Sequence, residues 1–275
     1  MKIEVKNLVH KYPSGEVALN GISAVFEGTE PIAIIGQNGA GKTTFVKHLN
    51  GLLRPSDGEV LINGESVEEH TTAFWSRKIG YVFQNPDNQL FLESVKKEFE
   101  FGPKQQGVPK KEIRWRLEKI ADLVGLTNKL YVHPFDLNAT EKKFCTIGSI
   151  LMMNPEMIIL DEPTCGQDIE GNQRLTKIIA SLKANNQLCL TITHDMKFVV
   201  ENFDQIIVMS KGQILNREKK EIIFSAPDVL KASYVSPPPI TRVGQILDLD
   251  QPVFNQQDFH RYFEEKRADK KRING

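Results

Sequence analysis

Short apolar runs alternate with amphipathic stretches through the middle of the chain. Runs with the length and composition of buried strands lie at 31–35, 59–63, 79–83, 157–160, 188–193 and 205–209. Stretches with helical character lie at 43–50, 94–106, 110–123, 138–153 and 169–184. This alternation predicts an α/β fold, in which helices cover both faces of a parallel sheet.

The two ends of the chain follow different patterns. Residues 2–9 alternate as a strand does, and 21–27 offers a second strand. Near the other end, three prolines at 237–239 interrupt the pattern, because proline neither continues a helix nor donates to a sheet ladder. We therefore expect a main domain at 1–235 and a small, helical C-terminal extension at 236–275.

Composition narrows the class of protein. The 275 residues hold 35 Lys and Arg against 35 Asp and Glu, and zero net charge argues against nucleic acid as the main partner. Three widely spaced cysteines, Cys145, Cys165 and Cys189, fit a reducing compartment and no metal cluster. No apolar run approaches the roughly 18 residues of a membrane-spanning helix, and the charged N-terminus lacks a signal-peptide core. These features predict a cytosolic protein.

One loop carries the clearest chemistry. Residues 36–44 read G-Q-N-G-A-G-K-T-T and fit the phosphate-binding template G-x-x-x-x-G-K-[ST], between a predicted strand and a predicted helix. Backbone amides of such a loop point at a phosphate, and the helix dipole favours its negative charge. The residues expected to bind a nucleoside triphosphate are Gly36, Gln37, Asn38, Gly39, Ala40, Gly41, Lys42, Thr43 and Thr44. Lys42 would reach the β- and γ-phosphates, and the Thr43 hydroxyl would bind Mg²⁺.

Two carboxylates follow the apolar strand at 157–160. Asp161 is expected to hold Mg²⁺ through a bound water, and Glu162 to orient and deprotonate the attacking water. An Asp-Glu pair after a strand is often only a solvated turn, so the assignment depends on the neighbouring phosphate loop.

Four further residues are candidates, each with a structural alternative. Tyr12 would stack on an adenine ring, or is a core tyrosine. Gln84 would bind Mg²⁺ or the attacking water, or is a loop amide. Asp168 would bind the nucleotide, or caps the helix that follows it. His194 would hydrogen-bond the γ-phosphate, or is structural.

The order of these pieces over about 3–215 resembles the ATP-binding cassette (ABC) ATPases. The resemblance implies a P-loop NTPase fold with a RecA-like parallel-sheet core, an antiparallel β-subdomain and a helical subdomain at about 85–153. It implies ATP and Mg²⁺ as cofactors, and Thr43, Gln84 and Asp161 as the metal-binding residues. It also implies head-to-tail dimers with ATP buried between two chains.

A narrower resemblance follows Gln84. Residues 84–91 read Q-N-P-D-N-Q-L-F, residues 100–103 read E-F-G-P, and the tail at 237–242 reads P-P-P-I-T-R. Together they are similar to the ATPase subunits of energy-coupling-factor (ECF) transporters and of cobalt and nickel importers. This resemblance implies a second ATPase subunit, a transmembrane scaffold subunit and a substrate-capture subunit, at the cytoplasmic face of the cell membrane. The extension is a candidate dimer contact.

The chain departs from the family at its signature, Leu-Ser-Gly-Gly-Gln, where it has Leu137, Asn138, Ala139, Thr140 and Glu141. In the family this motif contacts ATP held by the partner chain. An unpaired Glu141 about 6 Å from a phosphate would cost on the order of 3 kcal/mol at an effective dielectric of about 20. A lost hydrogen-bond donor would cost about 1–3 kcal/mol more. We therefore expect an asymmetric subunit of a heterodimer, unless the altered motif is tolerated.

Two other functions stay open at this point. A soluble ABC ATPase acting on translation or DNA is disfavoured by the zero net charge and the single cassette. A regulatory subunit that binds ATP without hydrolysing it would differ only in the role of Glu162. The transported substrate is not written in the sequence, because the ATPase subunit does not touch it.

Overall fold

A computed structural model describes the backbone of residues 1–273 and the side chains of residues 1–266. Residues 274 and 275, the end of the predicted extension, lie outside the described residues.

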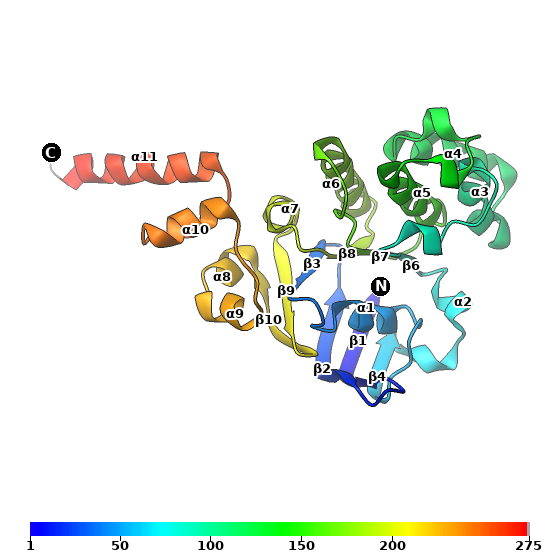
Figure 1. The fold of residues 1–275 in the computed structure, drawn as a ribbon, viewed down its shortest axis with the longest axis horizontal. Coiled ribbons are helices and arrows are strands. Elements are labelled where there is room, and N and C mark those ends of the chain that lie inside the picture. Colours follow the sequence, from blue (N-terminus) through cyan, green and yellow to red (C-terminus); the bar gives the residue numbers. More distant parts are fainter. Residues whose placement is uncertain (274–275) are drawn as a thin grey trace.

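A six-stranded sheet forms the centre of the molecule, in the order β10-β9-β3-β8-β7-β6 (Figure 1). The strands are β10 (Gln213–Lys219), β9 (Gln205–Ser210), β3 (Ile32–Ile35), β8 (Leu188–Ile192), β7 (Met157–Asp161) and β6 (Ile79–Val82). All neighbours pair in parallel except β10, which runs antiparallel to β9 at the edge. The α/β class predicted from the alternation is confirmed.

A second, antiparallel sheet packs below the first. It has the order β2-β1-β4-β5, with β2 (Val17–Glu27), β1 (Lys2–Lys11), β4 (Asp57–Ile62) and β5 (Glu65–Ser66). Helix α1 (Lys42–Leu49) contributes Phe45 and Leu49 to one buried cluster with Ile34 of β3 and Ile3 of β1. The helix that follows the phosphate loop is therefore held between the two sheets.

Both faces of the parallel sheet are buried, which explains its continuous apolar runs. Ile32 and Ile34 of β3 belong to the cluster shared with the antiparallel sheet, whereas Ala33 and Ile35 belong to a cluster shared with the helices. Helix α6 (Ile169–Ala184) and helix α7 (Met196–Asn202) pack on this second face.

Three helices gather at one end of the molecule (Figure 1), namely α3 (Val95–Gln105), α4 (Lys110–Leu123) and α5 (Ala139–Met152). Their contact is close, because a Cβ added to Gly148 of α5 would lie 2.3 Å from the Phe99 ring of α3. This helical segment follows β6 and precedes β7, so it is inserted between two adjacent strands of the sheet.

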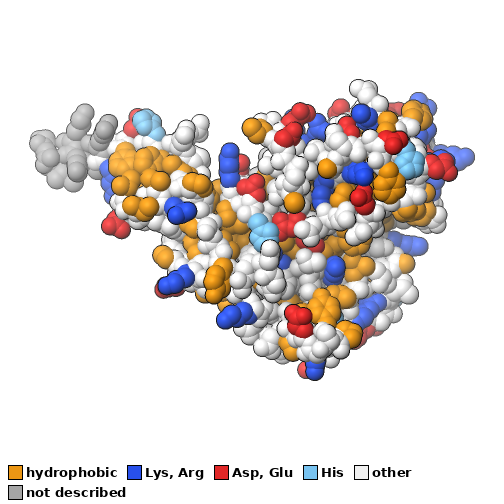
Figure 2. Space-filling view, viewed as in Figure 1, with side chains coloured by type: hydrophobic (Ala, Val, Ile, Leu, Met, Phe, Trp, Pro, Cys, Tyr) orange, Lys and Arg blue, Asp and Glu red, His pale blue; other side chains and the backbone are white. Residues whose placement is uncertain are grey.

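The C-terminal helices lie beyond the opposite edge of the sheet (Figure 1): α8 (Lys220–Phe224), α9 (Pro227–Ala232), α10 (Pro239–Ile246) and α11 (Gln256–Ile273). Figure 2 shows apolar side chains gathered on this lobe, where Val243, Ile246 and Leu247 are exposed. In the described part of the chain, no helix has both the length and the apolarity needed to cross a membrane.

The pattern of apolar and polar residues did not predict every helix and strand of the structure. Strand β2 begins at Val17, earlier than the predicted 21, and β10, α2 (Thr72–Trp75), α7, α8 and α9 were not predicted. Strand β10 has no fully buried residue, so it lacks the apolar run that marks the other strands. The missed helices are too short to show a helical period. Single-turn 3₁₀ helices add η1 (Val67–Glu69), η2 (Pro86–Asn88), η3 (Thr127–Lys129) and η4 (Pro134–Asp136).

Candidate functional site

The phosphate loop joins β3 to α1 and is shaped by its glycines. Gly36 has φ +148° and packs so closely on β9 that an added Cβ would lie 2.1 Å from the main-chain oxygen of Met209. Gly41, at φ +93°, is the N-cap of α1 and provides no side chain to cap it. The amides of Lys42, Thr43 and Thr44 open the helix and have no partner earlier in it. The loop is therefore an anion site built from main-chain donors.

The Lys42 side chain folds back over this loop. Its Nζ donates to the main-chain oxygens of Gly36 at 2.7 Å and Gln37 at 2.9 Å. Burial lowers the pKa of Lys42, while Glu162 and Asp161 raise it. The ammonium is thus held by the loop and lies near two carboxylates, that of Asp161 at the end of β7 and that of Glu162 just after it.

Asp161 is held by two hydroxyls from distant parts of the chain. It is 2% exposed, accepts a hydrogen bond from Thr43 Oγ1 at 3.1 Å, and accepts a second from the Tyr81 hydroxyl at 2.6 Å. Burial raises the pKa of Tyr81, so this hydroxyl remains a donor. Tyr81 was not among the predicted site residues, because a tyrosine within an apolar strand is normally interpreted as part of the hydrophobic core.

The oxygens of Thr43 and Asp161 fit Mg²⁺. This ion prefers oxygen ligands and is commonly bound by one or two carboxylates together with substrate phosphates and water. The described side chains include no cluster of three or more His, Cys, Asp or Glu that could hold a metal. An ion at Thr43 and Asp161 would also have the Gln84 side chain, which lines the same cavity, as a candidate oxygen ligand. Its remaining ligands would come from the nucleotide and water.

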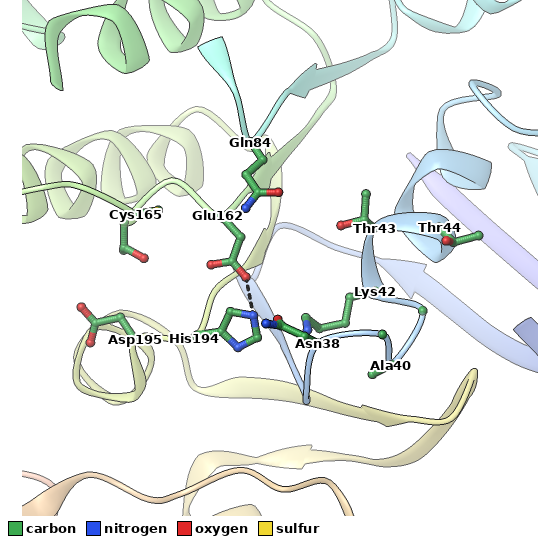
Figure 3. A pocket seen from close by; sticks show the side chains of 13 residues that line it. Asn38, Ala40, Lys42, Thr43, Thr44, Gln84, Glu162, Cys165, His194 and Asp195 are labelled. Atoms are coloured by element: carbon green, nitrogen blue, oxygen red, sulfur yellow. Dashed lines mark ion pairs between the residues drawn. The ribbon is translucent and has the colours of Figure 1, made fainter. Parts of the chain in front are cut away.

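Glu162 forms the second half of the site. It is 8% exposed, and its Oε1 lies 2.9 Å from Nε2 of His194 (Figure 3). Its φ of +49° is unusual for a residue other than glycine, and such strain concentrates at functional sites. Burial raises the pKa of Glu162 to about 7, against the opposing effect of Lys42. Burial also lowers the pKa of His194.

Lys42, Thr43, Glu162 and His194 line one cavity of about 560 Å³ (Figure 3). Gln84 and Glu162 reach into it from one side, and Lys42 and Thr43 face them from the other. The lining residues are Asn38, Gly39, Ala40, Gly41, Lys42, Thr43, Thr44, Gln84, Glu162, Thr164, Cys165, His194 and Asp195.

Three lining residues were missed in the sequence, Thr164, Cys165 and Asp195. They lie just after the carboxyl ends of β7 and β8, and the Thr164 hydroxyl is 2.6 Å from that of Thr193. The rule that ligands bind at the carboxyl ends of parallel strands could have found them.

Five candidates at the nucleotide site lie outside the lining, namely Tyr12, Gly36, Gln37, Asp161 and Asp168. The Tyr12 hydroxyl is 2.8 Å from the Thr44 hydroxyl, and its ring meets His10 edge-on. Asp168 caps α6, where its carboxylate accepts the amide of Gly171 at 2.7 Å. The structure thus shows Asp168 as a helix cap, which is the structural alternative to nucleotide binding.

The altered signature opens helix α5 as a capping box. The Asn138 side chain accepts the Glu141 amide at 2.8 Å, and the Glu141 carboxylate accepts the Asn138 amide at 3.1 Å. Lys129 lies 3.5 Å from the same carboxylate. Glu141 is therefore paired, and it repels a nearby phosphate less than the isolated charge assumed from the sequence. None of residues 138–141 lines the cavity.

Known proteins share this architecture. A family model described as ABC transporter matches residues 19–165, more than half of the chain. The energy-coupling factor transporter ATP-binding protein EcfA of Methanocaldococcus jannaschii is 35% identical over 90% of this chain and 89% of its own length. EcfA2 of Clostridium perfringens is also 35% identical, over 88% of each chain.

The solved structure of cbiO1 from Clostridium perfringens, part of the ABC transporter complex cbiONQ, is 30% identical and matches with a TM-score of 0.75. The match covers 90% of this chain and 98% of that one. The family match, the sequence identity and the shared fold agree, and the chain belongs to the ABC transporter family as an ATP-hydrolysing subunit.

Proposed function

We propose that this chain is an ATPase subunit of an ECF-type importer of a vitamin or a transition-metal ion. The observation that carries the proposal is that the phosphate loop, Gln84, Glu162 and His194 line one cavity, in a chain whose relatives are named as ECF ATPases. The partners would be a second ATPase subunit, a transmembrane scaffold subunit and a substrate-capture subunit. The chain would lie at the cytoplasmic face of the membrane, attached through these partners.

Binding of ATP follows from the donors of the loop. The amides that open α1 and the Lys42 ammonium would hold the β- and γ-phosphates, and Lys42 would exchange its loop carbonyls for phosphate oxygens. Thr43, Asp161 and Gln84 would hold Mg²⁺, which supplies charge neutralisation when bound. Tyr81 would orient Asp161 through its short hydrogen bond.

Hydrolysis requires a base for water, and Glu162 meets that requirement. A pKa of about 7 keeps part of the carboxyl ionised near neutral pH while leaving it basic enough to accept a proton. His194 would hold the carboxylate in place through its 2.9 Å contact and lies on the cavity wall, within reach of a γ-phosphate. Gln84 would position the attacking water.

We further propose that the chain works as an asymmetric partner. In the capping box the Glu141 carboxylate is fixed at the first turn of α5, and it places a negative charge close to where a phosphate held by a partner would lie. Ala139 and Thr140 add side chains where close approach of the backbone is needed. The chain's own phosphate loop would then be competent only against a partner with an intact signature.

A restoration variant tests this asymmetry. Replacing Asn138, Ala139, Thr140 and Glu141 with Ser, Gly, Gly and Gln should raise ATP turnover of the purified chain by at least about tenfold, the equivalent of about 1.4 kcal/mol in the barrier. Equal turnover by the wild-type and restored chains would contradict the asymmetry. Robust turnover by the wild-type chain alone would contradict it as well.

Purification from membranes tests the assignment to an importer. A tagged chain extracted in detergent should carry a second ATPase subunit and membrane proteins, and these membrane proteins identify the substrate. Association with ribosomes or DNA instead would favour a soluble ABC ATPase. In the purified complex, unchanged turnover after Glu162→Gln would indicate a regulatory chain that does not hydrolyse ATP.

A further inference from the structure

A buried lysine follows the altered signature and lies outside the phosphate loop and the hydrolytic residues. Lys143 lies early in α5 and is 3% exposed. Its Nζ donates to the main-chain oxygen of Gln84, and also to that of Phe83 at 3.4 Å. The helix that starts at the signature is thereby fastened to the residue that reaches into the cavity.

A second contact links the same two segments. Lys142 Nζ lies 3.0 Å from Asp87 Oδ1, just beyond Gln84. The two contacts differ in environment, since Lys142 and Asp87 are partly exposed whereas the Lys143 ammonium is enclosed. An exposed ion pair contributes little, while a charge-assisted hydrogen bond inside the protein is strong.

Stability alone does not explain a lysine at this position. Lysines are rarely buried, and a buried charge is often replaced by an apolar side chain of similar volume without loss of stability. Burial lowers the pKa of Lys143, and the carboxylates of Asp161 and Glu162 act in the opposite direction. The cation therefore faces the acidic side of the hydrolytic cavity as well as the Gln84 backbone.

We propose that Lys143 is a positioning residue that fixes Gln84 to helix α5, so that the signature end of the helix and the Gln84 side chain move together. A shift of α5 caused by a nucleotide at its N-terminus would then be transmitted to this chain's own cavity. The inference rests on the proposed role of Gln84 in hydrolysis. It adds a coupling between the two sites of an ATPase pair, carried by one side chain.

The test compares substitutions at two adjacent lysines. Lys143→Met keeps the length and apolar stem of the side chain and removes its charge, whereas Lys142→Met removes a charge from the same helical turn without touching Gln84. Lys143→Arg keeps the donors. ATP hydrolysis is measured for each variant in the assembly in which the wild-type chain turns over, with kcat and KM separated.

Lys143→Met should lower kcat about tenfold, with KM for ATP changed less than about twofold, because the tether acts on the catalytic geometry. Lys142→Met should stay within about twofold of wild type, and Lys143→Arg should recover most of the lost rate. A kcat for Lys143→Met within twofold of wild type, or an equal loss in Lys142→Met, overturns the proposal.

Amide hydrogen exchange gives a second readout that does not depend on turnover. In the purified chain, the peptide covering 83–89 should exchange about tenfold faster in Lys143→Met, with the melting temperature close to wild type. Unchanged exchange overturns the tether. If Lys143→Met does not fold, Lys143→Gln, which keeps a polar side chain without a charge, replaces it. The same changes in kcat and in hydrogen exchange are then expected of Lys143→Gln. Unchanged turnover in Gln84→Ala would contradict the proposed role of Gln84 in hydrolysis. The hydrogen-exchange result would still show whether Lys143 fixes the Gln84 segment to α5.

Discussion

Gly36 and Gly39 lie in the same loop, and the structure predicts different costs for the same substitution. A Cβ at Gly36 would lie 2.1 Å from the Met209 main-chain oxygen, whereas a Cβ at Gly39, at φ +78°, would have nothing within 4 Å. Gly36→Ala therefore meets both a left-handed conformation and a collision with backbone. Gly39→Ala meets the conformation alone.

The magnitudes follow from the packing of the sheet. The colliding oxygen is on β9, which pairs with β3 through Ile35 and Val208, so it cannot withdraw without disturbing the central sheet. Overpacking costs about 1–3 kcal/mol and a left-handed non-glycine residue about 1–2 kcal/mol. We expect Gly36→Ala to lose about 3 kcal/mol or more of unfolding free energy, and Gly39→Ala about 1 kcal/mol.

Urea unfolding of the two variants and the wild-type chain, without nucleotide and at one pH, measures the difference. The Gly36→Ala midpoint should lie clearly below that of Gly39→Ala. Equal midpoints, or the lower midpoint in Gly39→Ala, would refute the close approach between the phosphate loop and β9.

Two further predictions concern groups near the site. Burial lowers the pKa of His48 to about 4, so the unfolded chain takes up a proton from pH 6.5 downward while the folded chain does not. Its contribution to stability should fall by about 1.4 kcal/mol per pH unit between these values. Urea unfolding at pH 7 and pH 5 should therefore show a smaller acid loss in His48→Gln than in wild type, and identical losses would contradict it. Asp168→Ala should cost about 1 kcal/mol of stability through the lost helix cap, with ATP affinity of the single chain unchanged by calorimetry; a weakened affinity would show that Asp168 also contacts nucleotide.

The sequence predicted best what depends on neighbours along the chain. Strands buried on both faces give continuous apolar runs, which is why β3, β7 and β8 were found within a residue or two. The phosphate loop is local as well, since strand, glycines, lysine and helix are contiguous. The spacing of Asn138 and Glu141 is also that of a capping box, in which Glu141 is paired and is not the isolated charge expected from the sequence.

The sequence could not predict contacts made by the folded sheet. Tyr81 and Asp161 are 80 residues apart and meet because β6 pairs with β7. Lys143 and Gln84 are 59 residues apart and meet because α5 packs against β6 and the segment that follows it. In both cases the side chain looks ordinary in its local context, and its role depends on which strand or helix lies beside it.

In the proposed mechanism the phosphate loop holds ATP while Glu162 activates water, and one variant tests these two roles most directly. Glu162→Gln keeps the size of the side chain and removes the base. Single-turnover hydrolysis, in the assembly where the wild-type chain is active, should slow by at least about a hundredfold with binding of Mg²⁺-ATP retained. A hydrolysis rate above one tenth of the wild-type rate, with ATP bound, would contradict the account.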